Sequence, residues 1–151
     1  MSEFVRRATA DDAADLAALD QAYRAAVGGV ERGGPQLVSE LGDSDAALWR
    51  SRIDDDTWIV VVGGVDAVVL GMGALELPSA ASTGRISVLW VEPGAREIGL
   101  GEAVLAALME GARELGAARI EAVALPGDRE TKNLYERAGL VARLIVVDAE
   151  L

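Results

Sequence analysis

The segment Val88–Glu102 constrains the fold of this chain more than any other. An apolar run ends at Pro93, a short loop follows, and Gly99 and Gly101 open an amphipathic helix. A strand that leads through a glycine loop into a helix leaves several backbone N–H groups without partners, and the helix dipole adds roughly half a positive charge there. The segment therefore predicts an anion-binding site on a chain of net charge −11. A dinucleotide-binding loop would need a third glycine where Val104 stands.

The composition excludes several classes of chemistry. The 151 residues contain neither cysteine nor histidine, which removes disulfides, thiolate metal sites, a cysteine nucleophile and a serine–histidine–aspartate triad. A net charge of −11 without a basic stripe makes nucleic acid a poor partner. With 51% hydrophobic residues, the chain is expected to fold as one domain over 1–151. Its N-terminal sequence lacks the apolar core of a secretory signal, so we expect a cytoplasmic protein.

The stretch Trp58–Leu75 has the length of a membrane span and carries Asp66 as its only charge. The sequence Gly63-Gly64-Val65-Asp66 interrupts it with turn-forming residues, and its flanks are rich in β-branched Val and Ile. We therefore expect a buried β-hairpin, with strands at 58–62 and 68–77, and no membrane association.

The remaining pattern predicts a single α+β domain with the element order β-α-α-β-β-β-α-β-α-β. Apolar residues recur at helical spacing from about 13 to 28, over about 36–50 with a break near Gly42, and over 100–115. The other elements are expected to be strands at 4–7, 85–91, 119–125 and 140–147, and a short helix at 129–138.

Two motifs in this frame resemble the signatures of the GCN5-related N-acetyltransferase (GNAT) superfamily. Arg96-Glu-Ile-Gly99-Leu-Gly101 is similar to the family's Arg/Gln-x-x-Gly-x-Gly/Ala signature, and Asn133-Leu-Tyr135-Glu-Arg-Ala-Gly139-Leu resembles its Leu-Tyr-Glu-x-x-Gly-Phe helix. The element order also matches along nearly the whole chain. The resemblance implies a mixed, mostly antiparallel sheet with splayed central strands flanked by helices. It also implies a metal-independent transfer of acetyl from acetyl-CoA to a primary amine of a small molecule or peptide.

In that family the pyrophosphate of acetyl-CoA rests on backbone N–H groups of the glycine loop, which here is Ile98–Glu102, with Arg96 shaping the loop. Glycine lets the backbone approach a phosphate without an intervening Cβ. Pantetheine would insert like an added strand where the strand ending at Trp90 and Val91 splays from the strand at 119–125. The residues expected to bind the cosubstrate are Trp90, Val91, Arg96, Ile98, Gly99, Leu100, Gly101, Glu102 and Asn133, with Arg129 or Lys132 near the phosphoadenosine.

Tyr135 matches the position of the family's frequent general acid, which protonates the departing thiolate. A phenol with a pKa near 10 suits that role, although the ring is also explained by packing against its helix. The general base stays open among three carboxylates, of which Glu76 and Glu92 are preferred over Glu121. Ser87 is a candidate relay through water. For each of them, a solvent-facing position on a strand is the simpler explanation.

Three acidic residues depart from the family pattern. The family often has an asparagine seven residues before the tyrosine, where this chain has Asp128, and Glu97 and Glu102 flank the phosphate loop. The two glutamates favour a helix N-terminus but would also repel phosphate, so we expect modest affinity for CoA. A catalytically weak or inactive CoA-binding sensor or interaction module is therefore the alternative function.

The acidic excess lies in the N-terminal part, where residues 1–60 hold six arginines against twelve acidic residues. In this family the first helices shape the acceptor site. The acidic side chains there form either a solvated face or a cleft that attracts a cationic amine, and the sequence leaves both open. It also leaves open a homodimer through the C-terminal strand or the hairpin edge. The acidic residues concerned are Glu31, Glu40, Asp43, Asp45 and Asp54–Asp56.

Overall fold

The apolar stretch that begins at Trp58 forms a long antiparallel hairpin at the centre of the sheet, as its β-branched residues predict. In the computed structural model, which describes residues 2–151, strand β2 (Trp58–Val65) pairs with β3 (Val68–Glu76). The turn predicted at 63–66 lies instead at Asp66 and Ala67, whose φ angles are 49° and 69°. Gly63 stays in the strand, where a Cβ would lie 2.8 Å from Cδ1 of Leu100. Glycine at position 63 therefore allows the helix that begins at Leu100 to pack closely on the strand, and it is not part of the turn.

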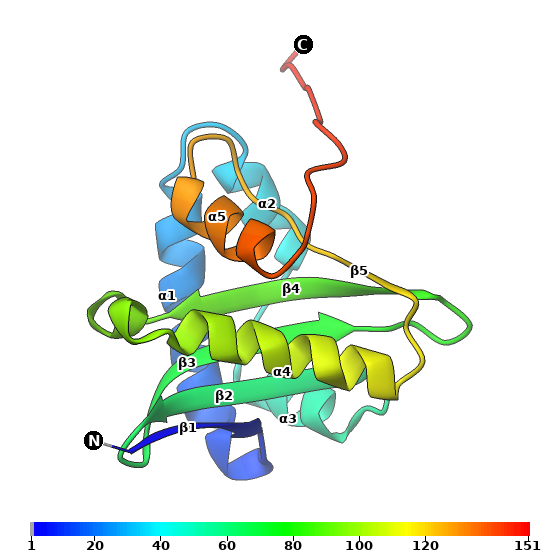
Figure 1. Cartoon of the computed structure of the whole chain (residues 1–151). Coiled ribbons are helices and arrows are strands. Elements are labelled where there is room, and N and C mark those ends of the chain that lie inside the picture. The colour runs from blue at the N-terminus through cyan, green and yellow to red at the C-terminus, as the bar shows by residue number, and fades with distance from the viewer. Residues whose placement is uncertain (1) are drawn as a thin grey trace.

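Five strands form one mixed sheet in the order β1-β2-β3-β4-β5 (Figure 1). Strand β1 (Glu3–Arg7) pairs antiparallel with β2, and β4 (Thr83–Val91) pairs antiparallel with β3. Strand β5 (Arg119–Glu121) is the one parallel neighbour and pairs with β4. The sheet is therefore mostly antiparallel, as the family resemblance implies.

Helices cover both faces of this sheet (Figure 1). Helices α1 (Ala13–Gly28) and α3 (Ala46–Asp54) lie on one face, and α4 (Leu100–Glu114) crosses the other. Helix α2 (Gly34–Leu41) packs on α1, and α5 (Arg129–Arg137) lies past the β4 edge of the sheet, alongside the C-terminal half of that strand. None of the helices within residues 2–151 is long and apolar enough to cross a bilayer.

Alternating strand residues contribute to a hydrophobic core on each face of the sheet. The core under α1 and α3 includes Leu16, Trp49, Met72 and Val88, and the core under α4 is built from its predicted apolar stripe. Members of the α4 core that are fully buried include Ile59, Leu75, Val104, Leu105 and Leu108. The helix predicted over about 36–50 is two helices, because Gly42 has a φ of 69° and ends α2.

Two predicted strands differ from the structure. The strand predicted at 119–125 pairs only over Arg119–Glu121, because the chain then turns away from β4. The last predicted strand, 140–147, is wrong: within residues 2–151 no segment pairs with it, and it runs away from the sheet. A β-rich sequence forms a strand only where a neighbour offers free backbone groups.

Candidate functional site

The free edge of β4 is the feature around which the site is built. Strand β4 pairs with β5 only over Thr83–Arg85, yet it continues to Val91. Its edge at residues 86–91 therefore has no strand partner on the β5 side within residues 2–151. Splayed parallel strands of this kind leave backbone N–H and C=O groups that an extended ligand can pair with. The pairing expected at 90–91 stays a prediction.

A bulge interrupts β4 beside this free edge. Ala74 pairs with Val88 and Leu75 pairs with Ile86, so Ser87 is the extra residue. The Oγ atom of Ser87 is buried and has no hydrogen-bond partner within the described residues. Bulges redirect side chains and are common next to active sites. Ser87 therefore keeps an unused hydroxyl beside the free edge, and its role as a relay stays a prediction.

The glycine loop follows β4 directly, as predicted. A 3-10 turn at Pro93–Ile98 leads to Gly99, which has a φ of 79° and stands before the first residue of α4. Leu100 is 2% exposed and packs with Val91 and Ala95, so the start of the helix is fixed to the end of the strand. The first-turn N–H groups of a helix have no intrahelical acceptors, which makes this loop competent to bind an anion.

The side chain of Arg96 packs against the loop and stabilises it. Its Nε atom donates to the carbonyl oxygen of Val91 at 2.9 Å, and its guanidinium lies 4.5 Å from the ring centroid of Trp90. Its Nη1 atom also lies 3.4 Å from Oε2 of Glu130 on α5. These contacts agree with the shaping role that the sequence predicts, and they tie the loop to α5.

Glu102 is oriented toward α5. Its Oε1 atom accepts from Nε of Arg137 at 3.0 Å, and both side chains are 58% exposed. The neighbouring guanidinium offsets part of the negative charge that Glu102 would present to a phosphate. Glu97, the other acidic residue of the loop, is exposed.

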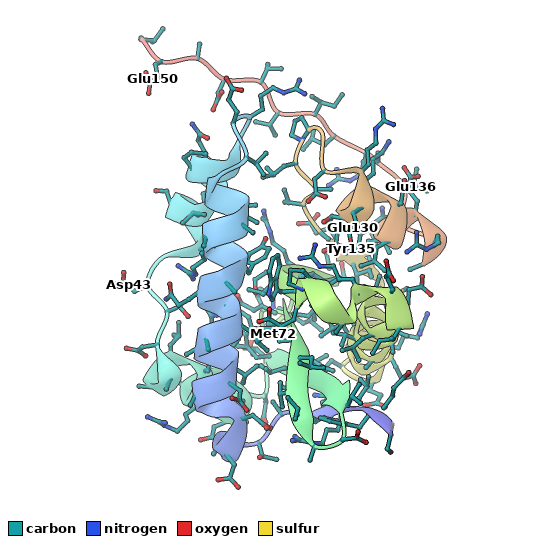
Figure 2. The ribbon with its side chains drawn as sticks, turned by 90° about the vertical axis from the view of Figure 1, so that its left-hand side faces the viewer. Asp43, Met72, Glu130, Tyr135, Glu136 and Glu150 are labelled. Atoms are coloured by element: carbon teal, nitrogen blue, oxygen red, sulfur yellow. The ribbon has the colours of Figure 1, made fainter. Side chains whose placement is uncertain are left out.

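Two tyrosines, one on α5 and one on α1, lie near the C-terminal half of β4. Tyr135 on α5 is 8% exposed, and Figure 2 shows it on the inner side of that helix. Burial raises the pKa of Tyr135 well above its usual value near 10, with smaller contributions from Tyr23 and Asp128. Tyr23 on α1 packs edge-on against Trp90, with ring centroids 6.1 Å apart. Sequence reasoning missed Tyr23 as a site residue because it fits the apolar stripe of α1.

Asp128 has a defined structural role. Its Oδ1 atom accepts from the backbone N–H of Thr131 at 3.1 Å, which caps the N-terminus of α5. Asn133, in the middle of α5, and Arg129, at its start, are exposed, and Lys132 lies 3.4 Å from Glu136. These residues stay predictions as binders of the cosubstrate.

The two preferred candidates for the general base lie far apart in the structure. Glu76 lies opposite Arg85 in the register of β3 and β4, whereas Glu92 follows Val91, which lies opposite Gly71. Five residues of β3 separate these positions, so the two carboxylates lie at opposite ends of β4, roughly 17 Å apart along the strand. Glu92 therefore borders the glycine loop, and Glu76 does not.

The third candidate for the general base, Glu121, forms ion pairs with two arginines. Arg143 Nη2 lies 3.3 Å from its Oε2 atom, and Arg85 Nη1 lies 3.9 Å from its Oε1 atom. Glu121 is therefore accounted for by its two ion pairs at the β5 end of the sheet.

A buried polar group that sequence reasoning missed lies on α1, next to the aromatic residues. Asp20 is 0% exposed; its Oδ2 atom accepts from Nε of Arg24 at 3.1 Å, while its Oδ1 atom has no partner within residues 2–151. Arg52 on α3 stacks on Trp49 and Trp58, with its Cζ atom 4.8 and 4.3 Å from the ring centroids. Charged groups thus line the α1–α3 side of the sheet, although no sequence motif marks them.

Several of the acidic residues in the N-terminal part cap local structure. Asp45 accepts from the N–H of Leu48 at 2.8 Å, and Asp55 accepts from the N–H of Thr57 at 2.8 Å. Figure 2 shows Asp43 on the outer side of α1, away from the sheet. These three residues therefore fit the solvated-face interpretation.

The comparisons with known proteins agree with this geometry. A family model described as the acetyltransferase (GNAT) family matches residues 30–140. A search of curated protein sequences found no match to the chain.

Solved structures resemble the whole fold. A tetramutant of the BH1408 protein from Bacillus halodurans has a TM-score of 0.75 at 18% identity, covering 98% of this chain and 99% of that chain. The aminoglycoside acetyltransferase meta-AAC0020 from an uncultured soil metagenomic sample has a TM-score of 0.73 at 16% identity, covering 99% and 95%. AAC(6')-Iy, in complex with the bisubstrate analog CoA-S-monomethyl-acetylneamine, has a TM-score of 0.72 at 12% identity, covering 100% of both chains.

Proposed function

Because this chain belongs to the acetyltransferase (GNAT) family, we propose that it transfers acetyl from acetyl-CoA directly to a primary amine of a small molecule or peptide. The observation that carries the proposal is the free edge of β4, which runs from the bulge at Ser87 to the glycine loop. An extended thioester with an anionic end matches that edge and that loop in both shape and charge.

In this proposal the pyrophosphate lies on the N–H groups of Ile98–Glu102. The pantetheine arm pairs with the β4 backbone at Trp90 and Val91, and the thioester then lies toward Ser87. The fixed start of α4 and the contacts of Arg96 support this arrangement, because a pre-formed loop loses little entropy when it binds.

The reaction needs one proton to leave and one to arrive. The amine nitrogen attacks the thioester carbonyl carbon, a C–N bond forms, and the C–S bond breaks. The thiolate takes a proton from Tyr135, and the amine gives up a proton to the base. The chain has no cysteine that could form an acyl intermediate, which favours direct transfer.

Glu76 is the better candidate for the base. Glu92 stands at the end of β4 that we assign to the pyrophosphate, whereas Glu76 stands at the other end, on the α1–α3 side with Trp58. Replacing Glu76 with Gln should lower kcat/KM for the amine by about 100-fold, and Glu92→Gln should leave kcat nearly unchanged. Equal losses in both variants would contradict the assignment.

The acceptor is proposed to be a small amine in a cytoplasmic setting. Two structures with the same fold are named as aminoglycoside acetyltransferases, which supports a small-molecule amine here. If acidic residues attract a cationic acceptor, KM for that acceptor should rise with ionic strength, whereas KM for a neutral acceptor should not.

A CoA-binding module without turnover is the second candidate. The burial of Tyr135 favours it, because a phenol with a raised pKa is a weaker acid toward a thiolate. Measuring thiol release from acetyl-CoA with a panel of amines separates the two functions. Release that depends on an added amine supports the enzyme. Saturable CoA binding without release for any amine, and without any effect of Tyr135→Phe on binding, supports the module.

A further inference from the structure

The guanidinium of Arg52 on α3 is a charged group to which the proposed reaction gives no role. Nine basic side chains form ion pairs within residues 2–151. All the basic residues that form none there are exposed except Arg52, which is half-buried. Arg52 is therefore a partly desolvated cation without an anionic partner in the described part of the chain. The residues without an ion pair are Arg32, Arg50, Arg52, Arg119 and Arg129.

Two tryptophan rings fix the position of this cation. The Cζ atom of Arg52 lies 4.3 Å from the ring centroid of Trp58 and 4.8 Å from that of Trp49, which is 0% exposed. An aromatic face attracts a cation but gives its N–H groups no oxygen or nitrogen that accepts a hydrogen bond. The guanidinium donates to no residue within 2–151, yet its nitrogens are not among the buried unpartnered atoms. They therefore reach the surface, where a ligand can accept from them.

The surroundings of Arg52 favour an added negative charge. Burial lowers the pKa of Arg52, and Arg24 lowers it further, whereas Asp20 and Glu76 oppose the change. The carboxylate of Asp20 is already paired with Arg24 at 3.1 Å, and no ion pair joins Glu76 to Arg52 within residues 2–151. A partly buried cation is stabilised when an opposite charge replaces the water that it has lost. An anionic group of a ligand would do this.

The position of Arg52 indicates which ligand carries that group. Trp58, over whose ring Arg52 lies, is opposite Glu76 in the register of β2 and β3. Ala74 belongs to the core under α1 and α3, so strand alternation places Glu76 on that same face. The glycine loop is at the other end of β4, roughly 17 Å away along the strand, so a phosphate of CoA on that loop does not reach Arg52. The anionic group is therefore part of the acceptor.

We propose that Arg52 binds the carboxylate of the acceptor, and that the acceptor is a free amino acid. The proposal rests on the proposed acetyl transfer, with the acceptor amine at Glu76. A guanidinium binds a carboxylate through two parallel hydrogen bonds. A dianionic phosphate would be repelled more strongly by Asp20 and Glu76, which lie on the same side of the sheet. An amine next to a monoanionic carboxylate matches one base and one guanidinium beside the same indole ring.

Thiol release from acetyl-CoA by the full chain tests this assignment with pairs of amino acids and their amides. For the best wild-type substrate, kcat/KM of the acid should exceed that of its amide by at least about tenfold. In Arg52→Gln the value for the acid should fall about 10- to 100-fold and the value for the amide less than about twofold. Comparing the acid-to-amide ratio between variants cancels the different basicity of the two amines.

The control for this ratio is Arg50→Gln on the same helix. Arg50 is exposed and forms no ion pair within residues 2–151, so the ratio should equal that of the wild type. An acid-to-amide ratio that is the same in the wild type and in Arg52→Gln would overturn the assignment. Thiol release with amides at least as fast as with acids in the wild type would also overturn it, while leaving the proposed acetyl transfer intact.

Tryptophan fluorescence provides a readout that does not need turnover, because Trp49 and Trp58 contact Arg52. In the presence of CoA, an amino acid should change the emission of the full chain saturably, and its amide should not. The change should be lost in Arg52→Gln and kept in Arg50→Gln. A saturable change for acids without thiol release from any amine would support the carboxylate site and contradict acetyl transfer. Equal changes for acids and amides would reject the carboxylate site.

Discussion

The Nε atom of Arg137 on α5 lies 3.0 Å from Oε1 of Glu102 in the first turn of α4. One of the two acidic residues of the glycine loop is therefore paired with a residue 35 positions further along the chain. The turn that precedes α4 is also joined to α5, by Arg96 and Glu130. Helix α5 thus supports the loop electrostatically while it also carries Tyr135.

Removing this arginine should weaken binding of CoA. In Arg137→Gln the carboxylate of Glu102 loses its counter-charge, so the dissociation constant of CoA should rise about threefold at low salt, and less at high salt. Calorimetric titration measures the change. Glu102→Gln in the same chain should restore the affinity. Arg113→Gln, which breaks a similar exposed pair with Glu110, is the control and should have no effect.

A side chain at Gly99 should be destabilising because of the backbone conformation there. Its φ of 79° is unfavourable for an L-residue, although no atom lies within 4 Å of a Cβ built there. Gly99→Ala should cost about 1 kcal/mol of folding stability and raise the dissociation constant of CoA about tenfold by distorting the loop. Gly94→Ala, in the same loop but without a positive φ, should change neither quantity. Equal effects of the two substitutions would contradict the assignment of Gly99.

The two tyrosines of the chain should differ sharply in activity assays. Tyr135→Phe should lower kcat by about 100-fold with little change in KM for acetyl-CoA, because the phenol acts only when the thiolate leaves. Tyr23→Phe keeps the edge-on packing with Trp90 and should lower kcat by less than about fivefold. A larger loss of kcat in Tyr23→Phe than in Tyr135→Phe would indicate that Tyr23, on α1, is the proton donor.

Asp12 should make stability depend on acid pH. It is 5% exposed, accepts from Arg6 at 2.7 and 3.0 Å, and accepts from the N–H of Thr9 at 2.8 Å. The hydrogen bond from Arg6 contributes most to a pKa below the usual value for an aspartate. The stabilisation is therefore present above the unfolded pKa near 4 and is lost as pH falls through the lower folded pKa.

Urea unfolding of Asp12→Asn measures this effect. The variant should lose about 1–3 kcal/mol relative to wild type at pH 7, and the difference should shrink below pH 4. Asp11→Asn, at the exposed neighbouring residue, should be within about 0.5 kcal/mol of wild type at either pH. A deficit in Asp12→Asn that stays constant down to pH 2 would contradict the role of the ionised carboxylate.

Local sequence patterns account for the parts of the site that were predicted. The loop at 93–101 could be recognised because strand end, glycines and helix start lie within one short segment. The sequence could not reveal the meeting of Tyr23 with Trp90, or of Glu102 with Arg137, because each pair joins elements that only tertiary packing brings together. Residue type suggested Glu76 and Glu92 equally, and only the strand register separates them.

The errors at the strand ends have a common cause. The apolar patterns at 119–125 and 140–147 are typical of strands, but pairing depends on a neighbouring backbone that a pattern does not describe. The hairpin turn was misplaced for a similar reason. Gly63 and Gly64 are residues typical of turns. In the structure both lie in strand β2, where α4 packs so closely that a side chain at Gly63 would clash, and a β-bulge lies between them.

Calorimetric titration of the purified full-length chain with CoA tests the central claim most directly, because both proposed functions require that ligand. We expect saturable binding of one CoA per chain, a dissociation constant below about 1 mM, and a change in the fluorescence of Trp90 beside the β4 edge. Gly99→Ala should weaken the same titration. An absence of heat and of any fluorescence change at millimolar CoA would contradict the account.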